Sequence, residues 1–405
     1  MRRNAVLFVL ISLLSGFGST AMTLAAGIWV YDLTDSPGLA ALTGLCIYAP
    51  TLAAPWLGAL VDRLPRRPLL IWTDLLLGVV LLSLLTVSGP EHTWLIFAVL
   101  LVRGISYVLV DAGETAILPA ALPASALGDI NGWRTSAQEG MKLLAPLAGA
   151  GLYAWQGPVP VVLLSAAMPA LTAACYGLLR VTSPAPRDGR KVAAGPVAGE
   201  REIWAGLVAL FGNPAVRVPV LMAAVAIALS GLTNAAVIER VVGGLGLPAT
   251  HLGFLSTAQG AGSIVGGLVA GRLLARFAPV GVAAIGAAVF AGGCLAWCLP
   301  WWPALVVGSV LVGVGLPWTL IAGVTAVQTR TPDHLLGRVG ASSTTVMFGP
   351  VALAIPLGSA VLQLGALVPL LVAAVVAFAV AGTQLRGKSA GQRADVSAAV
   401  GGSEP

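Results

Sequence analysis

Long apolar runs constrain this chain more than any other feature. Hydrophobic residues make up 58% of its 405 residues and charged residues only 9%, whereas about a quarter of a soluble domain is charged. A bilayer core of about 30 Å is crossed by about 20 helical residues. Twelve runs of that kind follow one another, at 5–31, 38–60, 68–88, 94–118, 131–154, 158–180, 215–238, 250–274, 279–299, 303–328, 339–363 and 365–385. The sequence therefore predicts an all-α polytopic membrane protein.

Basic residues indicate how the spans are oriented. If both termini are cytoplasmic, all 22 lysines and arginines except Arg103, Lys142 and Arg240 fall on the cytoplasmic side or at its border. Cytoplasmic loops of membrane proteins carry an excess of these residues. We therefore expect a multi-pass protein of the cell (cytoplasmic) membrane, with both termini cytoplasmic. The net charge of +6 then serves topology and requires no nucleic-acid partner.

One long polar stretch divides the chain. Residues 182–200 are rich in proline, glycine and charge, which is typical of a flexible linker. The next segment has the pattern of a short interfacial helix. The expected regions are an N-terminal six-helix half at 1–181, a cytoplasmic linker with an interfacial helix at 182–213, a C-terminal six-helix half at 214–387 and a disordered cytoplasmic tail at 388–405.

Two loops recur at one offset. "GALVDRLPRR", beginning at Gly58, aligns with "GLVAGRLLAR", beginning at Gly267, and "PASALG", beginning at Pro123, aligns with "PDHLLG", beginning at Pro332. Each pair is separated by 209 positions. Both pairs lie on the predicted cytoplasmic side, so the sequence predicts two parallel repeats related by an axis along the membrane normal.

The first of these loops carries a resemblance. "GALVDRLPRRPLL" resembles the loop between spans two and three of the major facilitator superfamily, Gly-x-Leu-x-Asp-Arg-x-Gly-Arg-Arg, with Pro65 in place of one glycine. "WVYDLTDSP", "AILPAALPASALGDINGW" and "TPDHLLGRVGA" resemble the branch that includes macrolide-efflux proteins and the enterobactin exporter. The resemblance covers nearly the whole chain. It implies the twelve-helix major facilitator fold and a monomeric transporter.

The resemblance also implies a cytoplasmic gate, in which this loop latches the two halves together in the outward-facing state. Asp62 supplies the carboxylate in the first copy, whereas Gly271 stands at that position in the second, so a latch there should be weaker. The alternative is that the charged residues of this loop serve only to orient the spans in the membrane. The candidate gate residues are Gly58, Asp62, Arg63, Arg66, Arg67, Arg272 and Arg276.

The fifth span partly resembles the antiporter motif of the family, Gly-x-x-x-Gly-Pro-x-x-Gly-Gly. In "GMKLLAPLAGAGL", Pro146 and Gly149 match, while Met141, Ala145 and Ala150 replace glycines. Small residues allow close helix approach, and a proline inside a span bends the helix. A well-packed, kinked helix is the structural alternative to a role in export.

Charged residues in the fourth and fifth spans are the main candidates for the transport pathway. At about 100° per residue, Arg103, Tyr107, Asp111 and Glu114 fit within one quarter of a helix. A charge at the centre of a membrane helix costs roughly 2.5–3.5 kcal/mol on insertion scales, so such groups are expected to face a partner or water. The resemblance places Arg103 at the span-four arginine implicated in proton-coupled drug export. The candidates for the proton and substrate pathway are Arg103, Tyr107, Asp111, Glu114, Glu139 and Lys142.

Three roles remain open for the last four of these residues. They form buried ion pairs that join spans four and five, or at least one acid carries protons, or they contact substrate. A proton carrier needs a carboxyl group whose affinity for the proton changes between conformations.

The sequence contains no phosphate-binding loop of the Walker type, no cluster of metal-ligating residues and no nucleophile elbow. We therefore expect no enzyme activity, no cofactor and no metal. The predicted function is secondary active transport, with proton-coupled efflux of a small amphipathic molecule such as a drug, macrolide or siderophore. The alternatives are an importer or facilitator of the same fold, and a lipid flippase. Expected partners are the small-molecule substrate, protons and membrane lipid, without nucleic acid.

Overall fold

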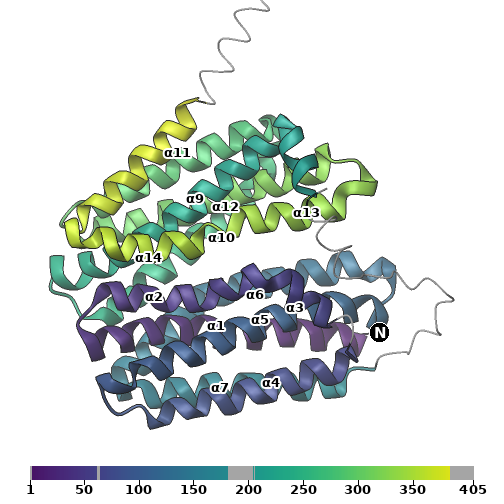
Figure 1. Ribbon diagram of the computed structural model, residues 1–405, viewed down its shortest axis with the longest axis horizontal. Helices are drawn as coiled ribbons and strands as arrows, with labels where there is room; N and C mark the ends of the chain where they lie inside the picture. The colour runs from purple at the N-terminus through teal and green to yellow at the C-terminus, as the bar shows by residue number, and fades with distance from the viewer. Residues whose placement is uncertain (1, 62–63, 181–203, 205, 384–405) are drawn as a thin grey trace, which may run out of the picture.

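The computed structural model describes residues 2–61, 64–180, 204 and 206–383. Its helices run side by side in two groups, one drawn from the first half of the chain and one from the second (Figure 1). We call the side of the bundle on which α1 begins the N-terminal side, and the opposite side the far side.

The first group comprises α1 (Arg2–Thr34), α2 (Pro37–Tyr48), α3 (Ala54–Val61), α4 (Arg66–Leu82), α5 (Thr93–Ala121), α6 (Ala124–Gln156) and α7 (Pro158–Leu178). The second comprises α9 (Pro214–Glu239), α10 (Leu252–Arg276), α11 (Pro279–Trp297), α12 (Trp302–Arg330), α13 (Asp333–Phe348), α14 (Val351–Val361) and a last helix, Leu367–Thr383. A 3₁₀ turn at Ala49–Ala53 joins α2 to α3.

These helices account for the twelve predicted spans. Nine segments of the described chain are long and apolar enough to cross a membrane. The other three crossings are α2 continued by α3, the 33-residue α6, and the last helix, Leu367–Thr383. Two crossings are each divided into two helices near a proline, at Pro50 and at Pro350, because proline has no N–H to continue the helical bonding.

The repeat predicted from the loops recurs in the hydrogen bonds of the structure. At the start of α1, Asn4 Nδ2 donates to the carbonyl of Ala121 at the end of α5, at 2.9 Å. Just before α9, Asn213 Nδ2 donates to the carbonyl of Arg330 at the end of α12, at 3.2 Å. Donor and acceptor are both displaced by the same 209 positions. Each asparagine satisfies a carbonyl that the end of a helix leaves unpaired.

The two groups contact each other mainly towards the far side. There α2 packs against α14 and α9, and α6 packs against α10. Thr257 Oγ1 on α10 donates to the Leu143 carbonyl on α6 at 3.1 Å. Among the described residues, the N-terminal-side continuations α3 and α13 do not form an extensive contact, and Figure 1 shows these two helices apart.

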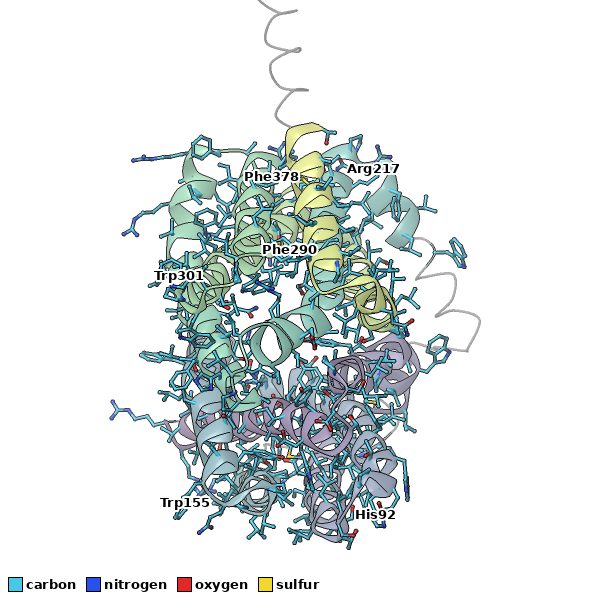
Figure 2. All side chains as sticks on the ribbon, turned by 90° about the vertical axis from the view of Figure 1, so that its left-hand side faces the viewer. His92, Trp155, Arg217, Phe290, Trp301 and Phe378 are labelled. Atoms are coloured by element: carbon cyan, nitrogen blue, oxygen red, sulfur yellow. The ribbon has the colours of Figure 1, made fainter. Side chains whose placement is uncertain are left out.

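Aromatic side chains mark the perimeter and the interior of the bundle. Trp155 at the end of α6 and Trp301 just before α12 are exposed and lie at the periphery of the far side (Figure 2). Phe290 on α11 is fully buried inside the second group. Tryptophan is enriched where a membrane meets water, so the positions of Trp155 and Trp301 are those expected of an interfacial belt.

Glycine allows the closest helix contacts, and one of them gives a stability prediction. A Cβ atom on Gly313 of α12 would lie 2.1 Å from the Gln259 carbonyl oxygen on α10, whereas a Cβ on Gly292 would meet nothing within 4 Å. Gly313→Ala is expected to destabilise the protein by about 1–3 kcal/mol, as overpacking does, and Gly292→Ala to leave stability nearly unchanged. Thermal unfolding of both purified variants measures this; equal midpoints would contradict the packing.

Candidate functional site

Arg103, near the middle of α5, is a buried cation held by hydroxyl groups of α1. Its side chain is 7% exposed. The guanidinium donates to Thr23 Oγ1 at 2.9 Å and to Ser19 Oγ. Thr23 itself donates to the Ser19 carbonyl at 2.8 Å, and this leaves its oxygen lone pairs free to accept from Arg103. The position is therefore built to hold a cation.

Arg103 has no carboxylate partner among the residues that the structure describes. Within the described part of the chain, no carboxylate oxygen lies within 4.0 Å of Arg103. A buried charge without a counter-ion is costly. Such a residue inside a span is a functional-site candidate by default.

Glu114, three helical turns further along α5, lies in a cluster that joins four helices. Its carboxylate forms an ion pair with Arg134 of α6 and accepts a hydrogen bond from the Tyr176 hydroxyl of α7. Arg134 also donates through Nε to Ser12 Oγ of α1 at 3.2 Å, and its guanidinium lies 6.0 Å from the centre of the Phe8 ring. Glu114 is thus a buried and fully partnered carboxylate.

Tyr107 and Asp111 lie between these two buried charges but are exposed. Asp111 interacts electrostatically with Arg134 and with Tyr107, and Tyr107 interacts with Tyr48 of α2. The predicted stripe is therefore divided: Arg103 and Glu114 contact neighbouring helices, whereas Tyr107 and Asp111 remain accessible.

Lys142 and Glu139 lie on α6, as expected. Lys142 is exposed, and its backbone carbonyl faces Gly260 of α10. The side chain of Glu139 lies outside the described residues. An ion pair does join α5 to α6, but the cation that pairs with Glu114 in it is Arg134.

Comparison with known proteins places this bundle in a family. The model of the Major Facilitator Superfamily matches residues 8–238 and 219–385. The chain belongs to this superfamily. It is therefore a multi-pass membrane transporter with the major facilitator fold, and not an enzyme.

Solved structures of superfamily transporters share this fold. A bacterial homologue of the iron transporter ferroportin, in an inward-facing state, aligns with a TM-score of 0.67 and 16% identity, covering 95% of this chain and 99% of that one. The nucleoside transporter NupG aligns with a TM-score of 0.70 and 13% identity, covering 95% and 98%. At such identities the likeness shows the fold and not the cargo.

A short sequence match links this superfamily member to an exporter. It is 36% identical over 69 residues to the putative bacilysin exporter BacE of Bacillus subtilis and of Bacillus amyloliquefaciens. The match covers 17% of this chain and 18% of the exporter.

The gate motif that suggested the superfamily is only partly visible in the structure. Asp62 and Arg63, together with the surroundings of Gly58, lie outside the described residues. Arg67 donates through Nε to the Tyr176 carbonyl at 3.0 Å and also to the Gly177 carbonyl. It therefore caps the end of α7 within its own half. The other candidate cations are exposed, namely Arg66, Arg272 and Arg276.

The two matching residues of the antiporter-like motif lie at helix contacts. Pro146 is buried inside α6, and its carbonyl lies beside Gly253 of α10 in the other half. A Cβ on Gly149 would lie 2.8 Å from the Ala21 carbonyl oxygen of α1. Both residues serve close packing, and whether they also serve export stays a prediction.

The second repeat shows what the fold itself requires at the charged positions. The residues 209 positions beyond Arg103, Glu114 and Arg134 are Val312, Gly323 and Ser343. All three are buried, and none carries a charge. The same architecture is thus packed in the second half without any of these charges. The fold as such therefore does not require a charge at these three positions.

Sequence reasoning missed several partners in this site: Ser19, Thr23, Arg134 and Tyr176. Arg134 falls near the predicted cytoplasmic border, where an arginine is expected for topology alone. Its spacing of eight residues from Lys142 was a weak signal, because it places the two cations about two turns apart and about 80° apart around α6. The hydroxyl partners on α1 and α7 gave no comparable signal.

Proposed function

We propose that this protein is a proton-coupled exporter of a small amphipathic molecule, such as a drug, macrolide, siderophore or similar metabolite, and that it works by alternating access. The observation that carries the proposal is the set of buried charges in the first half, centred on Arg103 and Glu114, which the second half replaces with uncharged residues. The transporter would act as a monomer in the cytoplasmic membrane, with both termini cytoplasmic.

The contacts between the halves support alternating access. The far-side helices α2 and α14 pack together, while their continuations α3 and α13 form no extensive contact within the described part of the chain. If both termini are cytoplasmic, as we propose from the distribution of basic residues, this arrangement corresponds to an inward-facing state. Rocking the two halves about a central site would close the α3–α13 end and open the α2–α14 end.

Two further features favour export. One is the sequence match to a putative exporter, although it is limited to 69 residues. The other is the partial antiporter motif at Pro146 and Gly149. An importer of the same fold, or a lipid flippase, would lack the dependence of cargo efflux on an inward proton gradient. A role in multidrug resistance would require that the protein export several unrelated drugs, and this role is part of the same proposal.

Alternating access is tested by locking the halves together on the far side. A Cβ on Gly38 of α2 would lie 3.5 Å from the Ser359 Cβ of α14, which is within the range for a disulfide. With the four native cysteines replaced by alanine, oxidation of the Gly38→Cys/Ser359→Cys variant is expected to abolish transport, and reduction to restore it. Accumulation of ethidium or radiolabelled erythromycin in everted vesicles measures this.

A matched pair within one half serves as the control. A Cβ on Gly323 of α12 would lie 3.5 Å from the Ala223 Cβ of α9, so Gly323→Cys/Ala223→Cys links two helices that need not separate. Transport that continued through a quantitatively oxidised Gly38→Cys/Ser359→Cys protein would exclude the proposed rocking motion.

A further inference from the structure

A second acidic group, on α4, lies buried close to the Glu114 cluster. Asp74 on α4 is 6% exposed. Its carboxyl group is hydrogen-bonded to the Thr172 hydroxyl of α7. No cation of the described residues lies within 4.0 Å of it. By contrast, the carboxylate of Glu114 has an arginine partner.

The hydroxyl of Thr172 can donate either to Asp74 Oδ2 or to the Pro169 carbonyl, and only a protonated Asp74 makes hydrogen bonds of both contacts. Thr172 Oγ1 lies 3.0 Å from the Pro169 carbonyl oxygen as well as within bonding distance of Asp74 Oδ2. A hydroxyl group has one proton to donate, and a carbonyl oxygen can only accept. If Thr172 donates to Pro169, the bond to Asp74 exists only when the Asp74 carboxyl donates its own proton. Both contacts are hydrogen bonds when Asp74 is a neutral acid.

The charges around Asp74 favour the same state. The helices packed against α4 are α5 and α7. From α5, Glu114 repels a negative charge on Asp74, and from α7, Tyr176 interacts with both acids. The one nearby cation in the described cluster, Arg134, is paired with Glu114. A second buried carboxylate would therefore lack compensation, and a buried acid without a cation is stabilised by taking up a proton.

The second repeat shows that packing does not require this pair. The positions equivalent to Asp74 and Thr172 are Ala283 and Ala381, 209 residues further along. Both alanines are buried in one apolar cluster of the second half. The helix interface that Asp74 and Thr172 occupy is thus formed elsewhere in this protein by methyl groups alone.

We propose that Asp74 is a proton-binding site of the transport cycle, occupied in this conformation and bonded through its proton to Thr172. The inference rests on the proposed function, because it names the residue that takes the proton. The proton comes from water. From the exposed Asp111 inwards, successive groups interact: Asp111 with Glu114, Glu114 with Tyr176, and Tyr176 with Asp74. Separation of α4 from α7 would remove the Thr172 bond, admit water and release the proton.

Infrared difference spectroscopy of the purified protein in nanodiscs, recorded between neutral and alkaline pH, tests the site without transport. Wild type is expected to show a protonated-carboxyl band at neutral pH that disappears on alkalinisation. Asp74→Asn should remove this band, and Thr172→Val should shift it to higher frequency because the hydrogen bond is lost. Asp32→Asn, at an exposed carboxyl group on the far side, should leave it unchanged.

One new variant, together with Thr172→Val, keeps the test decisive if Asp74→Asn does not fold. Asp74→Ala/Thr172→Ala reproduces the packing of Ala283 and Ala381 and should also lack the band, while Thr172→Val retains the acid. A wild-type spectrum without the band, or a band that survives in the Asp74 variants, overturns the proposal. Full gradient-driven accumulation of erythromycin by Asp74→Asn would also overturn the proposal. This variant is expected to retain the exchange of labelled for unlabelled erythromycin, while its gradient-driven uptake falls by at least about tenfold.

The two proposals fail in different ways. A band assigned to Asp74 in a wild-type protein whose transport ignores the pH gradient would support proton binding at Asp74 and refute proton coupling. Gradient-driven transport without that band would refute the Asp74 site and leave the proposed export function standing.

Discussion

Arg134→Leu is expected to destabilise the protein by about 3–5 kcal/mol, because it leaves the Glu114 carboxylate buried without its cation. The loss should be smaller at acidic pH, where Glu114 takes up a proton and the buried charge disappears. The double variant Glu114→Gln/Arg134→Leu should recover most of the stability, since removing both charges of a buried pair is often nearly neutral. Thermal and denaturant unfolding of the single and double variants gives the interaction energy.

Arg272→Leu is the matched control for this cycle, because Arg272 is an exposed cation on α10. It should change stability by less than about 0.5 kcal/mol, as surface substitutions usually do. If Arg134→Leu were as stable as this control, or if the double variant were no more stable than Arg134→Leu, the Glu114–Arg134 pair would not have the energetic role assigned to it.

Arg103→Val is expected to have the opposite profile, with transport lost and stability kept. Valine is the residue at the equivalent buried position, Val312, so the fold accommodates it. The loss of the charge-assisted hydrogen bonds to Ser19 and Thr23 is offset by removing the cost of burying a cation. Stability should therefore change little, whereas transport should fall by at least about tenfold, because the cation used in the cycle is gone. Accumulation of ethidium or erythromycin in everted vesicles and the unfolding midpoint are measured on the same preparation.

Arg103→Lys separates charge from geometry. A lysine keeps the charge but lacks the planar fork that reaches Ser19 and Thr23 together, so its transport should be intermediate. Normal transport by Arg103→Val would contradict a role for this cation in the cycle. A large loss of stability would instead show that Arg103 mainly holds α5 against α1.

Hydropathy and loop repeats were sufficient to predict the architecture. Apolar runs of span length report directly on the thickness of a bilayer, and the 209-residue offset found in the loops recurs in the Asn4 and Asn213 hydrogen bonds. The division of two crossings into α2 with α3 and α13 with α14 was not predicted. A single apolar run does not show where the backbone turns at Pro50 or Pro350.

The site could be predicted along one helix but not between helices. Periodicity placed Arg103 and Glu114 on a common quarter of α5. However, it gave no means of telling that Ser19 and Thr23 would surround one charge and Arg134 and Tyr176 the other. Those pairings depend on which helices are neighbours, and this is set by tertiary packing.

Asp111 and Glu114 illustrate the limit of a helical-wheel argument. They are three residues apart and about 60° apart around the axis, yet Asp111 is exposed and Glu114 is buried. The difference arises because Glu114 is bonded directly to Arg134 of α6 and Tyr176 of α7, which cover it. The gate residues Asp62 and Arg63 lie outside the described part of the chain, so the latch proposed for them stays a prediction.

Proton-coupled export is tested most directly by transport in everted vesicles with an imposed pH gradient. With an acidic interior, the protein is expected to accumulate ethidium or erythromycin, and nigericin, which collapses the gradient, should abolish the accumulation. For one-to-one exchange of a proton with a neutral cargo, one pH unit supports about tenfold accumulation, because 1.4 kcal/mol is a factor of ten. Asp32→Asn should behave as wild type. Uptake that is unchanged by nigericin for every cargo transported would contradict proton coupling.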